Sequence, residues 1–135
     1  MSSILKISEA VSLGIHACII IAKSQNSKIS ANKIAESLSA SEDHLAKVLQ
    51  RLVKAKIISS NRGPKGGFIL ARKPSEISLM EIYEAIDGEM PVKNNCLFEK
   101  PACKSSVCPL YELLSKVNKD VKEYFAQKSL AELIQ

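Results

Sequence analysis

Residues 41–73, with the sequence SEDHLAKVLQRLVKAKIISSNRGPKGGFILARK, decide the fold of this 135-residue chain. The stretch begins with Ser41, a residue type that caps helices, followed by two acids at the end of a helix where the dipole favours them. Apolar residues then recur at positions i, i+3, i+4 and i+7, which predicts the buried face of a helix that ends at about residue 55. These residues are Leu45, Val48, Leu49 and Leu52.

A β-hairpin is predicted immediately after this helix. Residues 57–60 and 68–71 suit two short strands, and residues 62–67 between them need the conformational freedom of glycine. Upstream, residues 24–29 are mostly polar and are expected to form a loop. Ser30 is then placed to cap a short helix over residues 31–38, and a tight turn leads into the next helix. Two helices joined by a tight turn and followed by a basic hairpin predict a winged helix-turn-helix.

A helix is also predicted over residues 9–23, where the sequence is apolar nearly all round. Such a helix is buried on several sides, and Glu9, Ser12 and His16 form its one polar stripe. The apolar run is too short to span a membrane, and only one basic residue precedes it, so we expect neither a membrane segment nor a signal peptide. The expected location is the cytoplasm.

The C-terminal half predicts two more helices separated by an irregular segment. A helix over residues 78–87 ends at Gly88, and Pro109 is placed to begin a long final helix. Its apolar stripe consists of Leu110, Leu113, Leu114, Val117, Val121, Tyr124 and Phe125. We expect a mainly α fold with a small β-hairpin wing. The winged helix-turn-helix domain covers 1–88, a cysteine-containing loop 89–108, and a dimerisation helix with its tail 109–135.

The positive charge of the chain is concentrated in residues 41–73. The whole chain has a net charge of +5, but residues 41–73 hold eight basic and two acidic side chains, a net charge of +6. A concentrated positive field attracts a polyanion and steers its approach. Charge alone would also fit a solvated basic surface.

The helix over residues 41–55 is therefore the candidate recognition helix for double-stranded DNA. Near its start, Lys47 can donate to guanine and Asp43 can accept from cytosine, whereas side chains further along the helix reach phosphates. The wing can enter a minor groove or touch the backbone. The candidate DNA-binding residues are Ser41, Asp43, His44, Lys47, Arg51, Lys54, Arg62 and Lys65. The same pattern would also fit a basic αα-hairpin that binds protein.

Three cysteines, Cys96, Cys103 and Cys108, lie in the irregular segment. In a reducing compartment, metal or redox chemistry is a better explanation for them than structural disulfides. Their spacing lacks the close cysteine pair of most zinc sites and suits an iron–sulfur cluster whose fourth ligand comes from elsewhere. Free thiols or one loop disulfide are the alternatives. Cys18 is expected in the core, and His16 is either a core residue or a cluster ligand.

The whole chain resembles the IscR/NsrR-type family of winged-helix iron–sulfur regulators. The resemblance is most specific at residues 44–55 and 62–68, and the cysteine loop matches in order. It implies a homodimer joined through the C-terminal helix, a two-fold DNA operator, and Cys96, Cys103 and Cys108 as cluster ligands. Some relatives lack the cysteines and respond through a protein partner.

The resemblance leaves the fourth ligand and the cluster type open. Members with a histidine three positions after the third cysteine bind a 2Fe–2S cluster, but this chain has Tyr111 there. Other members use an acid or a histidine from the first helix of the partner subunit. His16 matches such a histidine, whereas the acid position holds Ser12 and Glu9 lies one turn earlier. A 2Fe–2S or a 4Fe–4S cluster therefore fits.

These patterns predict a DNA-binding transcription regulator whose operator affinity depends on an iron–sulfur cluster and which senses cluster status, nitric oxide or redox stress. The alternative is a cluster-free regulator switched by thiol oxidation or by a protein partner. A third hypothesis, an electron-transfer or cluster-carrier protein, does not explain the basic wing. The acids are scattered and neither histidine has a nucleophile beside it, so we expect no enzyme activity.

Overall fold

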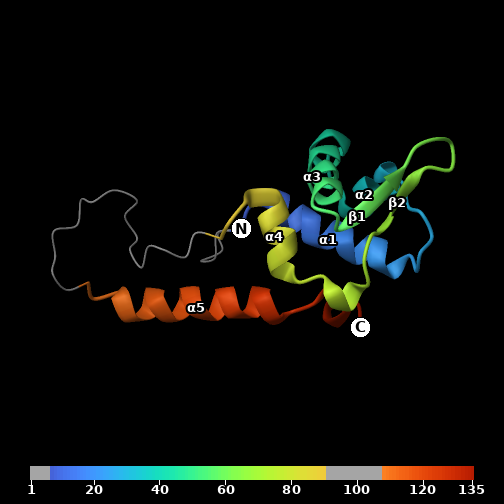
Figure 1. Ribbon diagram of the computed structural model, residues 1–135. Coiled ribbons are helices and arrows are strands. Elements are labelled where there is room, and N and C mark those ends of the chain that lie inside the picture. The colour runs from blue at the N-terminus through green and yellow to red at the C-terminus, as the bar shows by residue number, and fades with distance from the viewer. Residues whose placement is uncertain (1–6, 91–107) are drawn as a thin grey trace.

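The computed structural model describes residues 7–90 and 108–135 and is mainly helical with one β-hairpin (Figure 1). The predicted mainly α fold with a hairpin wing is confirmed. In chain order the elements are α1 (Glu9–Lys23), α2 (Ala31–Leu38), α3 (Glu42–Lys54), β1 (Ile58–Asn61), β2 (Gly67–Leu70), the 3-10 helix η1 (Pro74–Glu76), α4 (Leu79–Asp87), α5 (Tyr111–Gln127) and α6 (Leu130–Leu133).

Helix α1 is the centre of the molecule, because it packs against α2, α3, α4, β2 and α6. Its N-terminus is capped by Ser8, whose hydroxyl accepts from the backbone N–H of Val11 at 3.1 Å. Val11, Ala17 and Cys18 are fully buried, as expected for a helix that is apolar on most sides. Gly14 allows α4 to approach closely, since a Cβ there would overlap Ile86 Cδ1.

The helix-turn-helix is formed by α2 and α3, and its start signals act as the sequence predicts. Ser30 and Ser41 cap the two helices through hydrogen bonds from the N–H groups of Lys33 and His44. Ser39 ends α2 in the left-handed conformation with φ of 50°, which turns the chain tightly into α3. The predicted apolar stripe of α3 is confirmed, since the four leucine and valine residues that form it are all buried.

The wing is an antiparallel hairpin in which Ile58 pairs with Leu70 and Asn61 pairs with Gly67. On the other side of β2, Ile29 forms an isolated bridge with Phe68, with N–O distances of 3.2 and 2.8 Å. Residues 24–29 were expected to be a loop, so this bridge is a difference from the sequence prediction. A Cβ on Gly67 would lie 2.8 Å from the Ile29 carbonyl oxygen, which explains why a glycine is needed here.

The C-terminal end of α5 is anchored to this domain. Phe125 meets Tyr83 of α4 in an edge-to-face contact with ring centroids 6.0 Å apart. The chain then forms a bridge between Ser129 and Ser78, and Leu130 is fully buried in the core. The predicted start of α5 is slightly wrong: Pro109 lies in the preceding turn and the helix begins at Tyr111.

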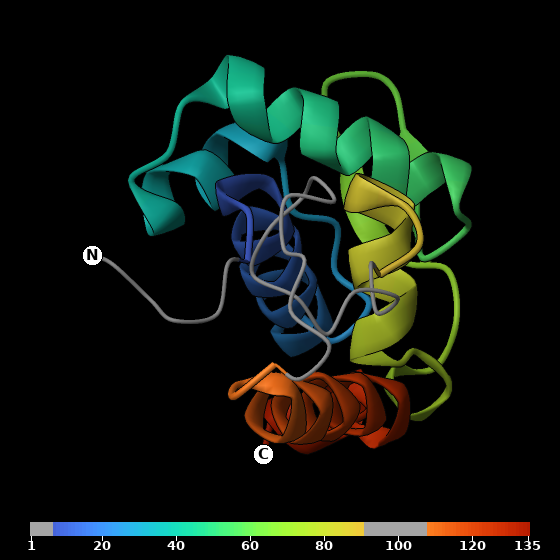
Figure 2. The same cartoon turned by 90° about the vertical axis from the view of Figure 1, so that its left-hand side faces the viewer.

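The candidate recognition helix, α3, and the candidate dimerisation helix, α5, lie on opposite sides of the molecule (Figures 1 and 2). In both views α3 lies on one side of α1 and α4, and α5 lies on the other (Figures 1 and 2). The N-terminal part of α5 projects away from the folded domain (Figure 1). In the described ranges, 7–90 and 108–135, no helix has both the length and the apolar character that a membrane span requires.

Candidate nucleic-acid interface

The outward face of α3 carries the side chains that were predicted to meet DNA. Asp43, Lys47, Arg51 and Lys54 are exposed, and His44 is half-buried. Ser41 is exposed as well, but its oxygen already accepts the capping hydrogen bond from the N–H of His44. Its hydroxyl proton remains able to donate to an acceptor on a ligand. The buried stripe of the same helix fixes which side chains point outward.

A polar contact joins the two helices of the helix-turn-helix. The Asn32 side-chain amide of α2 donates to the Glu42 carboxylate at the start of α3. Because Glu42 is held in this way, it orients the first turn of α3 relative to α2. The same hydrogen bond engages the Glu42 carboxylate, so this acid is already paired although it lies next to the candidate base-contacting residues.

Arg51 has a second contact that the sequence did not indicate. Its Nη1 donates to the backbone carbonyl oxygen of Ile86 at 2.7 Å, in the last turn of α4. Carbonyls at a helix C-terminus lack partners within the helix and carry its negative dipole end, so a guanidinium satisfies both. Arg51 therefore holds α3 against α4, and the other N–H groups of its guanidinium can still donate elsewhere.

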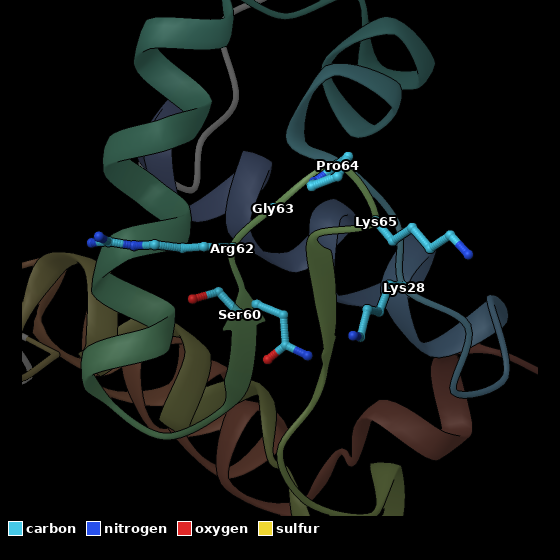
Figure 3. Close-up of a pocket in the computed structure, with 7 residues that line it drawn as sticks. Lys28, Ser60, Arg62, Gly63, Pro64 and Lys65 are labelled. Carbon is cyan, nitrogen blue, oxygen red and sulfur yellow. The ribbon is translucent and has the colours of Figure 1, made fainter.

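The wing carries a basic surface depression, shown in Figure 3. Its lining consists of Lys28, Ser60, Asn61, Arg62, Gly63, Pro64 and Lys65. Arg62 extends toward α3, whereas Lys65 extends to the other side of the wing (Figure 3). Lys28 was missed by the sequence analysis because it lies in the segment expected to be a loop. The only available signal was the glycine at position 67, which permits the Ile29 bridge.

The candidate metal ligands are described only in part. Cys96 and Cys103 lie outside the described residues. Cys108 is half-buried just before α5, and its carbonyl accepts from the N–H of Tyr111 at 3.2 Å. Within residues 7–90 and 108–135, no three histidine, cysteine or acidic side chains come together as a metal site would require.

His16 is exposed, and its Nδ1 lies 2.7 Å from the carbonyl oxygen of Ser12 one turn earlier. A carbonyl oxygen is an acceptor, so Nδ1 is the donor in this contact, and in the neutral imidazole Nε2 keeps its lone pair. An imidazole held in this way by its other nitrogen is the usual form of a histidine ligand. Of the two explanations for His16, burial in the core is ruled out by its exposure.

Cys18 is a core residue, as predicted. Its side chain is fully buried in α1, and burial raises the pKa of the Cys18 thiol to about 12. The thiolate is the form that binds metals and attacks disulfides. Cys18 is therefore inert at neutral pH in the folded protein.

Comparison with known proteins points to one family. Residues 7–135 match the family model of Rrf2, described as an iron-dependent transcriptional regulator. The chain is 36% identical over 78 residues to the HTH-type regulator BadM of Rhodopseudomonas palustris, covering 58% of this chain and 50% of BadM. It is 29% identical over 122 residues to the regulator NsrR of Bacillus licheniformis, covering 83% of this chain and 79% of NsrR.

Solved structures of similar proteins have the same architecture. CymR, described as the global cysteine regulator of B. subtilis, superposes with a TM-score of 0.80 at 26% identity over 97% of both chains. IscR from T. potens superposes with a TM-score of 0.72 at 27% identity, over 96% of this chain and 86% of that one. The oxidised form of CymR from Staphylococcus aureus gives 0.75 at 28% identity, over 97% of both chains.

The contact between Arg51 and Ile86 can be tested by its effect on stability. Replacing Arg51 with alanine leaves the α4 carbonyl without its donor, and a hydrogen bond from a charged group contributes about 1.5–3 kcal/mol. Because Arg51 is exposed, water can replace part of this interaction, and we expect Arg51→Ala to lower the free energy of unfolding by about 1–2 kcal/mol in urea titrations. Lys47→Ala, which removes an exposed charge from the same helix, should change it by no more than about 0.5 kcal/mol. Equal stability of the two variants would contradict the role of Arg51 in holding α3 against α4.

Proposed function

The chain belongs to the Rrf2 family of transcriptional regulators, and we propose that it is a homodimer whose affinity for a two-fold DNA operator is controlled by an iron–sulfur cluster. It is a regulator and not an enzyme. The resemblance to the IscR/NsrR-type family that the sequence predicted is confirmed.

The observation that carries the DNA-binding proposal is the shared orientation of α3 and the wing. The outward residues of α3 include Lys47 and Lys54. The wing hairpin, in which Arg62 and Lys65 lie, is on the same side of α1 as α3 (Figure 1). In a helix-turn-helix the N-terminal part of the recognition helix meets base edges. Lys47 and Asp43 are therefore assigned to base contacts, with Ser41 and His44 beside them. Lys54 is assigned to a phosphate.

The dimer proposal rests on the exposed apolar side chains of α5 and of the turn before it. Leu110, Tyr111, Leu113 and Tyr124 have exposed fractions of 39%, 55%, 57% and 53%. Large apolar groups left exposed on a helix that projects from its domain are typical of a protein interface. A second copy of α5 is its simplest partner, because a two-fold dimer also sets two recognition helices about one DNA turn, roughly 34 Å, apart.

The cluster proposal assigns Cys96, Cys103 and Cys108 as thiolate ligands and His16 of the partner subunit as the fourth. The donor set fits, because thiolates and imidazole suit iron–sulfur clusters and His16 Nε2 is free to bind. When bound, the cluster supplies a redox-active group that holds the cysteine segment in one arrangement. Cys108 directly precedes α5, so fixing it would bias the position of the dimer helix.

A second candidate function is regulation by thiol oxidation without a cluster. It is favoured by the likeness to CymR, for which an oxidised form has been solved. The same three cysteines would carry the switch, since burial of Cys18 removes its thiolate from consideration. Regulation by a protein partner is the other form of this alternative.

The DNA assignment predicts different behaviour for two lysines of α3. If Lys47 contacts a base, Lys47→Ala should lower affinity for the selected operator by about 1–3 kcal/mol and relax sequence preference. If Lys54 contacts a phosphate, Lys54→Ala should weaken operator and random-sequence duplexes alike and reduce the salt dependence. Fluorescence anisotropy with both duplexes measures this. Equal losses on both duplexes for Lys47→Ala would refute its role in base contacts.

The dimer assignment is tested at Leu113, which is exposed, so that a charge there does not disturb the core. Leu113→Glu should give monomers in sedimentation velocity at micromolar concentration, because a carboxylate cannot be buried in an apolar interface without a partner. Lys122→Glu, on an exposed position of the same helix, is the matched control and should remain dimeric. A monomeric unmodified protein would end the proposal.

The cluster assignment predicts visible absorption in protein purified without oxygen. Cys96→Ala, Cys103→Ala and Cys108→Ala should each abolish it, Cys18→Ala should leave it, and His16→Ala should make it short-lived. Operator affinity should differ at least several-fold between the protein with and without iron, as linkage requires for a cluster that controls binding. Colourless protein whose affinity changes on mild oxidation would favour the thiol alternative instead.

A further inference from the structure

Lys28 is the basic residue of the wing region that the proposed function does not use. It directly precedes Ile29, whose bridge to Phe68 makes residue 29 a one-residue third strand beside β2. This pairing brings Lys28, which is distant in sequence from the hairpin, into the lining of the wing depression. Lys28 is exposed and thus accessible to a large ligand.

The position of the Lys28 side chain is set by a neighbour on the far strand. With the Asn61 amide oriented to donate to the Ser60 carbonyl at 3.1 Å, its oxygen accepts from Lys28 Nζ at 2.5 Å. The β2 residue paired with Asn61 is Gly67, so no side chain separates the lysine from the asparagine. A held ammonium loses less side-chain entropy when it binds a ligand than a freely rotating one.

The depression has the chemistry of a phosphate-binding surface. It is lined by three cationic side chains and contains no acidic residue. The tip of the wing is Gly63-Pro64, which presents no long side chain, so a bulky polyanion can come close to the three cations. Lysine binds phosphate as a point charge and needs no fixed approach angle.

The three cations do not point the same way. Arg62 extends toward α3, while Lys65 extends from the opposite side of the wing, where Lys28 also lies (Figure 3). A wing that enters a groove is flanked by the two sugar–phosphate backbones that form its walls. Cations on opposite sides of the wing would therefore meet different stretches of backbone.

We propose that Lys28 and Lys65 together bind the DNA backbone on the side of the wing away from α3, at phosphates distinct from those nearest Arg62. The proposal rests on the proposed DNA-binding function and deepens it. It adds Lys28 as a binding residue and gives the wing two backbone contacts, one on each side. Binding breaks no covalent bond and releases condensed counterions from the duplex.

The first test measures how DNA affinity depends on salt. With a random-sequence duplex of about 30 base pairs, enough for two half-sites, affinity is followed by anisotropy between about 50 and 200 mM salt. Lys28→Ala should lower the slope of log K against log salt by about 0.9 and weaken binding about eightfold at 0.1 M, the factor for one lost phosphate contact. Lys65→Ala should do the same, and the double variant should lose about twice the slope.

Two controls separate a phosphate contact from a general effect of charge or stability. Lys28→Arg keeps the charge and should keep the slope. Lys73→Ala removes an exposed positive charge next to η1, at the end of the hairpin opposite the wing tip, and should leave the slope unchanged. An unchanged melting temperature for Lys28→Ala shows that the Ile29 bridge has survived.

A second measurement locates the contact on DNA. On an operator duplex selected in vitro, single neutral methylphosphonates replace backbone phosphates in turn. At one of these positions the unmodified protein and Lys28→Ala should have equal affinity, because the phosphate that Lys28 contacts has been neutralised. This position should be the same as, or next to, the position found in the same way for Lys65→Ala, and remote from the position found for Arg62→Ala.

The outcomes keep this inference distinct from the proposed function. The inference is overturned, and the regulator proposal stands, if the unmodified protein binds DNA and Lys28→Ala has the same slope of log K against log salt as the unmodified protein. It is also overturned if the methylphosphonate position found for Lys28→Ala coincides with the one found for Arg62→Ala. If the unmodified protein shows no salt-dependent binding to any duplex, the proposed function itself fails.

Discussion

The burial of α1 is the constraint on which the rest of the structure depends. Its residues are apolar on most sides, so a single partner cannot cover it, and α2, α3, α4, β2 and α6 all pack on it. The elements assigned to DNA and the anchor of α5 are thus positioned by one common helix. Glu9, His16 and Lys23 are its exposed residues, and His16 is available as a ligand because it lies on this uncovered side.

Local sequence patterns predicted the elements whose ends are set by neighbouring residues. The cap at Ser41 and the apolar period of α3 gave its position and its outward face, since both act within a few residues. The pairings of Ile29 with Phe68 and of Ser78 with Ser129 join distant parts of the chain and leave no periodic trace. The place of Lys28 beside the wing and the anchoring of α5 follow from these pairings, so neither could be predicted.

The sequence predicted which face of α3 forms the candidate site, but not which groups the ends of its long side chains contact. Helical periodicity places the Cα of Arg51 on the outward face of α3, and that part of the prediction holds. A guanidinium, however, lies several bonds from its Cα and can reach back to a neighbouring helix, as its contact with the Ile86 carbonyl shows. The fourth ligand stays a proposal for a related reason: a ligand from a second subunit leaves no spacing pattern in one chain.

The buried thiol of Cys18 has a practical consequence for following the protein in solution. A thiol reagent can reach it only when α1 separates from the helices around it, because the side chain is fully buried. Its rate of alkylation therefore measures how often the core opens. Cys108, half-buried beside α5, is subject to no such requirement. One cysteine thus reports the integrity of the fold, independently of whatever chemistry occurs at the other three.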